Sequence, residues 1–425
     1  MYTHKPDLLI QSAIIIDPAS EFNGRQMDIL IQNGLIALIA SSIDPINIES
    51  IDLKGASVSP GWFDLHANFG EPGNETKEDM VSGTLAAMKG GFTGTALMPD
   101  TEPSLHSKSE IEYIRNKAKG LPIEIVPIGA ISRHREGKEL AELYDMWLSG
   151  ARAFSDGDHP VQNAGLLLRA MQYAGDFGGL IMSNPEDLAL TGGAKVNEGI
   201  NSLLLGMKGI PAIAEELMVA RDLLLAEYAN CRIHFCAIST AGSVNQIKKA
   251  RNSGIKVSVA VAAYHLLLDD SNLSKFDSNY KVKPPLRTNE DRLALIGGLI
   301  DGSIDVVCSQ HIPHEAELKK VEFESAAYGM IGLETSYSLL NMALNGNHPE
   351  LIVELLSINP RKILGLELPS INVGAPANLT WYNPEKEWIL EKKDLGSKSS
   401  NSPWLGKKLM GKIYGAYVSE QLNLN

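Results

Sequence analysis

From about residue 56 to about residue 344, short apolar runs alternate with stretches of helical periodicity. Each run ends in a polar segment, and a helical stretch follows it, always in this order. The predicted strands are 57–65, 91–98, 123–130, 151–155, 179–183, 232–238, 255–261 and 304–309. The predicted helices are 78–89, 108–117, 138–148, 164–173, 212–229, 243–252, 289–300 and 333–344. Eight strand–helix units in series favour a closed (β/α)8 barrel of the α/β class, with a doubly wound open sheet as the alternative.

Both ends of the chain have a different pattern, typical of short antiparallel strands. Residues 1–55 alternate between apolar and polar positions, and Asn33-Gly34 inside the second run predicts a hairpin. After about residue 350 strand-like pieces return. We therefore predict a barrel domain over 56–350 and one small β unit built jointly from 1–55 and 351–425.

Size and charge narrow the classes of function. The 425 residues, 44% of them hydrophobic and 21% charged, suit one large α/β domain with a small additional unit. The net charge of −13 is spread along the chain, so a nucleic-acid backbone would be repelled. We expect no nucleic-acid partner.

The cysteines and the N-terminus bear on location. Cys231, Cys236 and Cys308 lie inside or beside apolar runs, as buried reduced thiols do. The start of the chain lacks a basic segment followed by an apolar one, and no apolar run approaches the ~18 residues of a membrane span. We expect a cytoplasmic protein without a membrane anchor.

The polar residues that follow the predicted strands are the candidates for chemistry, because a (β/α)8 barrel carries its active site there. They are Asp64, His66, Asn68, Glu71, Asp100, Arg133, His134, Asp156, Asp158, His159, Asn184, Ser239, Thr240, Tyr264, His265, Gln310, His311 and His314. A metal-dependent hydrolase needs several imidazoles and a carboxylate converging on one point, about four to six donors per ion. The first, fifth and eighth strands are instead followed by the amides Asn68, Asn184 and Gln310. An amide is a poor ligand for transition metals and no general base near neutral pH, so the donors of a two-metal site are missing.

Several segments also resemble dihydroorotases, the cyclic amidohydrolases of pyrimidine synthesis. They are VSPGWFDLHANFGEPGNETKED, GGFTGTALMPDTEP, VNEGINSLLLGMKGIPAIAEELMVARDLLLAE, ISTAGSV, KVKPPLRTNEDRLALIGGLIDGSIDVV and YGMIGLETSYSLL. The resemblance runs in unbroken order from near residue 8 to about residue 384. It implies a metal-bearing (β/α)8 TIM barrel with a small β-sandwich built from both chain termini.

This chain departs from the family pattern at nearly every metal ligand that the resemblance implies. The family positions hold His66, Asn68, Gly157, Asn184, Ala237 and Gln310 here. Gln310 replaces the aspartate that binds metal and shuttles the proton in the family, so no catalytic residue is expected. His66 and, through a slip of one residue, Asp158 are the possible remnant donors. We expect no metal or other cofactor, and we expect His66 to be hydrogen-bonded to a neighbour.

The substrate positions that the resemblance implies have changed as well. They form a vestigial pocket of Gly70, Asp100, Lys283 and His314, in which Gly70 stands where the family has an arginine. Asp100 and Lys283 replace two asparagines and are expected either to pair across the pocket or to be exposed on the surface.

Two hypotheses from different classes follow. In the first, the chain is an inactive structural or regulatory subunit, since similar dihydroorotase-like chains assemble with aspartate transcarbamoylase; homo-oligomers suit either hypothesis. In the second, His66, Asp158, His311 and His314 form an altered or mononuclear zinc site that hydrolyses a cyclic amide C–N bond. The second hypothesis predicts bound metal and turnover.

Overall fold

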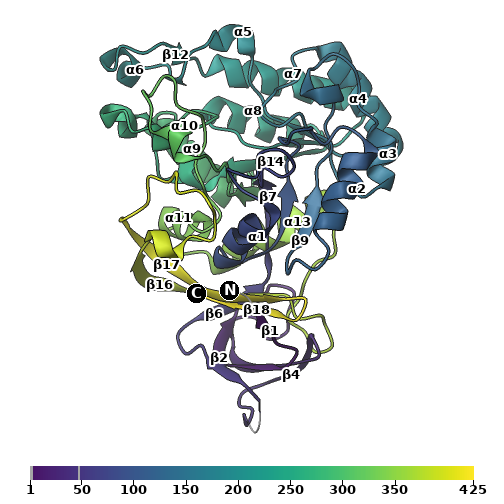
Figure 1. Ribbon diagram of the computed structural model, residues 1–425, viewed down its shortest axis with the longest axis vertical. Coiled ribbons are helices and arrows are strands. Elements are labelled where there is room, and N and C mark those ends of the chain that lie inside the picture. The colour runs from purple at the N-terminus through teal and green to yellow at the C-terminus, as the bar shows by residue number, and fades with distance from the viewer. Residues whose placement is uncertain (1–2, 46–47) are drawn as a thin grey trace.

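Parallel strands close a barrel in the computed structural model, which describes residues 3–45 and 48–425 (Figure 1). The strands are β7 (Trp62–Ala67), β8 (Phe92–Leu97), β9 (Glu124–Pro127), β10 (Ile181–Ser183), β13 (Ile233–Phe235), β14 (Val257–Ala262) and β15 (Val306–Cys308). Between β9 and β10, the predicted strand 151–155 is reduced to Phe154, which bridges Gly129 and Ile181 in parallel. A parallel bridge from Ala67 to His311 joins the last strand to the first. The barrel prediction is thus confirmed, and the open sheet is wrong.

Helices surround the barrel in the predicted order. They are α1 (Met80–Lys89), α2 (Lys108–Lys117), α3 (Leu143–Leu148), α4 (Ala164–Asp176), α7 (Ile213–Ala229), α8 (Ala241–Asn252), α9 (Asn289–Ile300) and α11 (Ser336–Ala343). Polar side chains fix where several begin: Asp79 accepts from the amide of Ser82 at 2.8 Å, and Thr240 accepts from that of Ser243 at 3.1 Å.

Short elements that the hydrophobic pattern did not predict lie in the loops. They are η1 (Arg133–Arg135), α5 (Leu188–Thr191), β11 (Val196–Asn197), α6 (Ile200–Leu204), β12 (Gly209–Ile210), η2 (Ala263–Leu266), η3 (Asp270–Lys275), η4 (Ser278–Tyr280), α10 (Ala316–Lys319) and η6 (Lys392–Asp394). Four of them, from α5 to β12, are inserted between β10 and α7.

The two chain ends build one sheet at the far end of the molecule from α5 and α6 (Figure 1). Its strands, in spatial order, are β1 (Thr3–His4), β18 (Gln421–Leu424), β17 (Lys408–Val418), β16 (Leu379–Ile389), β6 (Ser57–Pro60), β2 (Leu8–Ile15), β3 (Gln26–Gln32) and β4 (Leu35–Ala40), with β5 (Ser50–Asp52) beside β2. Asn33 and Gly34 join β3 to β4 with positive φ angles of 49° and 75°, which confirms the hairpin. The sheet encloses an apolar core of its own, with Trp381 and Tyr417 fully buried.

The structure moves both predicted boundaries of the barrel domain. Residues 57–60, predicted to begin a barrel strand, form β6 and pair with β16 and β2. The chain then passes to the barrel at Gly61, where a Cβ would collide with Asn378 and Thr93.

Residues 351–364 were predicted to return to the β unit, but they are helical. They belong to α12 (Pro349–Val353), the π-helix η5 (Glu354–Ile358) and α13 (Asn359–Leu364), and η5 and α13 pack on the barrel strand β7. Ile352, Leu355 and Leu356 give the reason, because apolar residues three and four positions apart share one helical face that needs a core to cover it.

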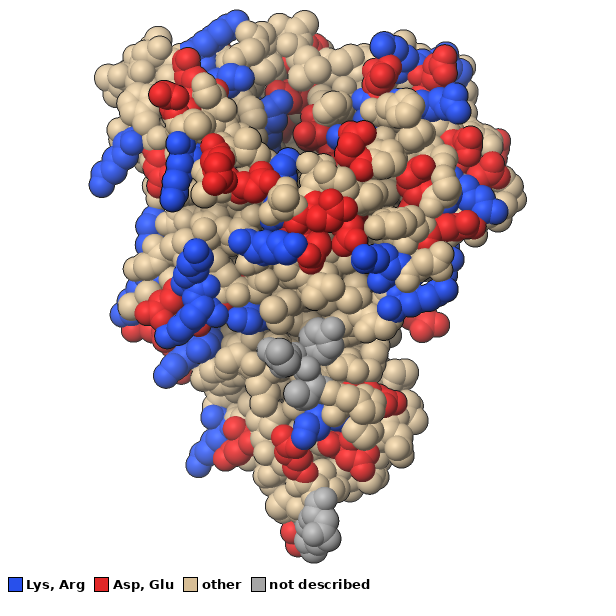
Figure 2. Space-filling model, in the orientation of Figure 1, with Lys and Arg blue, Asp and Glu red and all other residues tan. Residues whose placement is uncertain are grey.

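Lysine and arginine side chains are interspersed with aspartate and glutamate over the visible face of the molecule (Figure 2). The three cysteines are free and buried, as predicted. Within the described ranges, no helix combines the length and the apolar character needed to cross a bilayer.

Candidate functional site

A cavity of about 370 Å³ opens at the carboxyl ends of the barrel strands. Its wall contains ten of the eleven residues that the resemblance implies as metal, remnant-donor or substrate positions, all but Gly157: His66, Asn68, Gly70, Asp100, Asp158, Asn184, Ala237, Lys283, Gln310 and His314. The strand ends therefore bring the predicted residues together. What each of them can still do depends on its hydrogen bonds.

His66, near the end of β7, is a neutral imidazole facing the cavity. Its residue is only 4% exposed, and burial lowers its pKa to about 4. Its Nδ1 atom has no hydrogen-bond partner among the described residues, so the expected bond to a neighbour is wrong. His66 remains able to donate one electron pair to a ligand.

Two of the three amides at the other family positions are engaged within the protein, whereas Asn68 Oδ1 is buried without a hydrogen-bond partner among the described residues. Asn184 donates from Nδ2 to the carbonyl of Gly157. Gln310 accepts from the Tyr264 hydroxyl and donates from Nε2 to the carbonyl of Lys283 at 2.9 Å. These bonds orient both amides as parts of the wall.

Gly157 leaves no room for the carboxylate that the family carries there. Its φ of 59° is left-handed, and a Cβ on it would collide with the carboxylate of Asp100. Ala237, at another family position, has no donor atom at all.

Arg135, which the sequence reasoning missed, sits between two carboxylates of the cavity. Its Nη1 atom pairs with Asp100 and lies 2.7 Å from Asp158 Oδ1. Burial and the charge of Asp158 raise the pKa of Asp100 far above its usual range. Burial also acts to raise the pKa of Asp158, but its hydrogen bond with Asp100 and the charge of Arg135 bring it below its usual value. The guanidinium thus supplies the positive charge between these carboxylates.

Neither expected arrangement of Asp100 and Lys283 is found. They do not pair, since Lys283 reaches Glu186 instead, with Nζ 2.9 Å from Oε2, and their side chains are only 10% and 30% exposed. The side chain of Arg135 reaches the cavity because the backbone has a positive φ at two successive residues, 53° at His134 and 58° at Arg135. Sequence periodicity does not reveal this backbone conformation.

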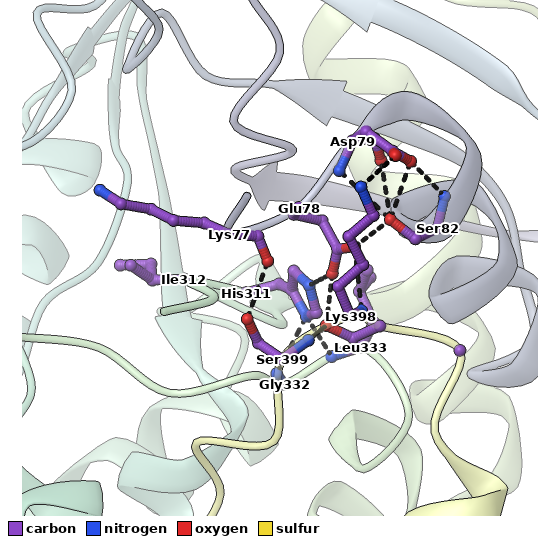
Figure 3. Close-up of polar contacts among 12 residues, drawn as sticks. Lys77, Glu78, Asp79, Ser82, His311, Ile312, Gly332, Leu333, Lys398 and Ser399 are labelled. Atoms are coloured by element: carbon purple, nitrogen blue, oxygen red, sulfur yellow. Dashed lines mark hydrogen bonds and ion pairs between the residues drawn. The ribbon is translucent and has the colours of Figure 1, made fainter. Parts of the chain in front are cut away.

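His311 points away from the cavity, toward α1 (Figure 3). Its Nε2 atom lies 3.3 Å from Glu78 Oε2, and its Nδ1 accepts from the amide of Gly332 at 3.3 Å. His314 does line the cavity but donates from Nε2 to the carbonyl of Tyr328 at 2.8 Å. The donor group of the second hypothesis is not brought together.

Zinc, the metal that the family implies, does not fit this donor set. Each zinc ion takes about four nitrogen, sulfur or carboxylate ligands in proteins. In the part of the chain that the structure describes, no three His, Cys, Asp or Glu side chains are grouped so that they could hold a metal ion. His66 alone at the family positions retains a suitable donor.

The barrel with a sheet built from both chain ends is a fold that solved structures share. Solved structures of the same fold include L-hydantoinase from Arthrobacter aurescens, with a TM-score of 0.84 at 22% identity over 98% of this chain and 95% of that one. A D-hydantoinase matches with a TM-score of 0.82 at 22% identity, over 99% of this chain and 95% of that one.

The sequence comparisons are more specific. The family profile described as Dihydro-orotase-like matches residues 55–243. A protein named dihydroorotase from Syntrophus aciditrophicus is 41% identical over 420 residues, 98% of each chain. Another of that name, from Acetivibrio thermocellus, is 40% identical over 417 residues, 97% of each chain. The chain belongs to the dihydroorotase family.

Proposed function

We propose that this chain is a non-catalytic member of the dihydroorotase family that acts as a structural or regulatory subunit. What supports the proposal above all is the donor chemistry of the cavity. Of the family's ligand positions, His66 alone carries a good zinc donor, and the others carry amides, glycine and alanine. Loss of a single catalytic group commonly costs a thousandfold or more in rate, and here several are changed together.

The partner we propose is aspartate transcarbamoylase, with the chain itself forming a homo-oligomer in the cytoplasm. The resemblance to inactive family members that assemble with this enzyme supports the partner. The three buried thiols are in keeping with a reducing compartment. The net charge of −13 argues against a nucleic-acid partner.

A second candidate function is dihydroorotate hydrolysis with an altered or mononuclear zinc site. Relatives of about 40% identity over nearly the whole chain carry the name dihydroorotase, and this favours the second candidate. His66, with its free Nδ1 atom, is the side chain from which such a site would have to be built.

An activity assay separates the two. The full chain, supplied with zinc, is compared with its S. aciditrophicus relative for release of carbamoyl aspartate from dihydroorotate. The proposal predicts no turnover above the protein-free rate. Turnover near that of the relative would overturn the proposal in favour of the second candidate.

The partner is tested separately by light scattering on mixtures with the transcarbamoylase of the same organism. Co-elution at a mass above either protein is expected. Two unshifted peaks at micromolar concentrations would contradict this assignment while leaving the inactivity untouched.

A further inference from the structure

Tyr328, in the wall of the cavity, is surrounded by lysine ammonium groups. The Nζ atoms of Lys281, Lys283 and Lys195 lie 4.8, 5.2 and 5.7 Å from the centre of its ring. Of these three, Lys283 is paired with Glu186. Positive charge is therefore concentrated at one side of the cavity in a chain whose net charge is −13.

Lys77, in the same wall, adds a further ammonium group. Figure 3 shows its side chain pointing away from Glu78 and His311. It lies close enough to His314 that its charge, together with burial, lowers the pKa of that imidazole. Lys77 and Lys195 are both half-buried, and neither ammonium group lies within ion-pair distance of a carboxylate in the ranges 3–45 and 48–425. Half-buried charges without a counter-ion favour an anion that comes from outside.

Two more ammonium groups lie behind Tyr328. Lys281 and Lys319 donate to backbone carbonyl oxygens of the segment 323–329 at distances of 2.6 to 2.9 Å. Carbonyl oxygens solvate a charge without neutralising it. Burial and the charge of Lys195 lower the pKa of Lys281 to about 8, and burial and the charge of Lys281 lower that of Lys319 to about 7. The lysines around Tyr328 thus repel one another.

The carboxylates of the wall do not supply the missing counter-charge. Four of the five are already engaged: Asp100 and Asp158 with Arg135, Glu186 with Lys283, and Glu215 with Ser239 and Ser243. The fifth, Glu102, is exposed to solvent. The net charge of the whole chain has little effect at the cavity, because exposed charges are screened beyond about 8 Å at physiological ionic strength.

The strand end of the cavity is uncharged but offers hydrogen-bonding groups. Asn68 Oδ1 and His66 Nδ1 are buried and have no partner in the part of the chain that the structure describes. Burial lowers the pKa of His66 to about 4, so its imidazole is neutral near pH 7. An amide side chain presents a donor beside an acceptor, and the edge of a nucleobase presents the same pattern.

We propose that the cavity binds a nucleoside monophosphate, with its phosphate beside Tyr328, where Lys77 and Lys195 supply the positive charge, and its base against Asn68 and His66. A phosphate monoester carries a charge of about −1.5 to −2 at pH 7, which two ammonium groups balance. The volume of about 370 Å³ falls in the range of roughly 300–1,000 Å³ that small-molecule sites occupy. The inference rests on the proposed function in one respect, since the nucleotide acts as a regulatory ligand that is not turned over.

The test titrates the full chain, purified free of metal, with uridine and adenosine 5′-monophosphates by isothermal titration calorimetry. The two nucleosides and inorganic phosphate are the comparison ligands. We expect at least one of the nucleotides to bind at micromolar concentrations, one per chain, and the nucleosides and phosphate to bind about tenfold or more weakly. No binding of either nucleotide at millimolar concentrations would overturn the proposal. Phosphate that binds as tightly as the nucleotides would also overturn it, by showing a site for the anion alone.

Lysine variants test where the phosphate lies. Lys77→Gln and Lys195→Gln are each expected to raise the dissociation constant of the nucleotide about tenfold or more, because a charge-assisted hydrogen bond is lost. Lys54→Gln, which removes one exposed charge between β5 and β6 of the sheet built from the chain ends, is the matched control and should bind as the wild type does. Unchanged affinity in both cavity variants would contradict the proposal.

Asn68→Leu tests the position of the base. It should weaken the binding of the nucleotide and leave that of inorganic phosphate unchanged, whereas an unchanged affinity for the nucleotide would contradict the assignment. If a variant does not fold, hydrogen exchange of the wild type decides: the nucleotide should protect the segment 323–329, and protection confined to other segments would overturn the proposal. The proposed function fails separately, through turnover of dihydroorotate, which these binding measurements do not report.

Discussion

His311 and Glu78 meet in the interior, with 3.3 Å between Nε2 and Oε2 and no exposed surface on either side chain. Burial opposes ionisation of Glu78, but hydrogen bonds from His311 and Ser397 and the charge of His311 together lower its pKa. The Glu78 carboxylate also accepts from the amide of Lys398 at 3.1 Å. The pair therefore joins the loop after β15, the start of α1 and the loop 395–403 (Figure 3).

Glu78→Gln is expected to lower the free energy of unfolding by about 1–3 kcal/mol or more, since buried donors lose a charged acceptor. Chemical denaturation measures the loss, and hydrogen exchange is expected to quicken at Lys398, whose amide donates to Glu78. Glu75→Gln, on an exposed neighbour, is the control and should change stability by less than about 0.5 kcal/mol. Equal stabilities of the two variants would contradict the role given to Glu78.

Arg135→Met removes the positive charge between Asp100 and Asp158. The expected cost is about 1–3 kcal/mol, because the largely buried Asp100 carboxyl loses a hydrogen-bonding partner, whereas Asp158 is 61% exposed and stays solvated. The deficit should shrink when Asp100→Asn is added. It should also shrink at low pH: the raised pKa of Asp100 means that its protonated form favours the folded state, and this contribution is lost as the pH rises through the folded pKa.

The control for the Arg135→Met variants is Arg133→Met, which removes an exposed arginine two residues away. Its stability should match that of the wild type at every pH. A loss in Arg135→Met that Asp100→Asn does not relieve would show that the two residues are not coupled.

Acid should destabilise the protein partly through His265. The Nε2 atom of this buried imidazole lies 3.1 Å from the carbonyl oxygen of Pro284, and burial lowers the pKa of the imidazole from 6.5 to about 4. A lowered folded pKa means that the stabilising contribution is complete above pH 6.5 and is lost as the pH falls from 6.5 toward 4. At about 1.4 kcal/mol per pKa unit, the loss of unfolding free energy reaches roughly 3 kcal/mol near pH 4.

His265→Asn should therefore flatten the dependence of unfolding free energy on pH by up to one proton within that window. Urea unfolding at a series of pH values measures the slope. His4→Gln, on a side chain that is 63% exposed, should leave the slope unchanged. A slope that His265→Asn does not alter would place the protonation elsewhere.

Restoring the family's donors should create a zinc site. The substitutions are Asn68→His, Asp100→Asn, Gly157→Asp, Asn184→His, Ala237→His and Gln310→Asp. Asp100→Asn restores the family's amide and removes a negative charge beside the new carboxylate of Gly157→Asp. The side chain at 100 has to turn away from the new Cβ, while an aspartate tolerates the left-handed backbone at 157. We expect zinc to raise the melting temperature of this variant and not that of the wild type. A variant that folds but gains no zinc would contradict the assignment of these positions.

The sequence predicted regular elements best where local signals agree. The helices 108–117 and 289–300 were predicted to the residue, since Ser107 and Thr288 precede them as capping residues and their apolar positions recur helically. The predicted strand 151–155 forms only a bridge at Phe154, because an apolar run does not by itself specify how long the pairing extends.

At the cavity, the sequence predicted which residues meet but not how they bond. His66 and Asn184 line the wall as expected, because strand ends fix backbone positions. The outward turn of His311 and the approach of Arg135 depend on tertiary packing and on left-handed backbone, neither of which has a sequence period.

The zinc content of the full-length wild-type chain tests the central claim most directly. Protein purified without chelator is exposed to zinc, freed of loosely held metal and analysed by elemental mass spectrometry. With His66 as the one suitable donor at the family positions, the account predicts far less than one zinc per chain, the same as in His66→Ala. A full equivalent or more that disappears in His66→Ala would contradict it.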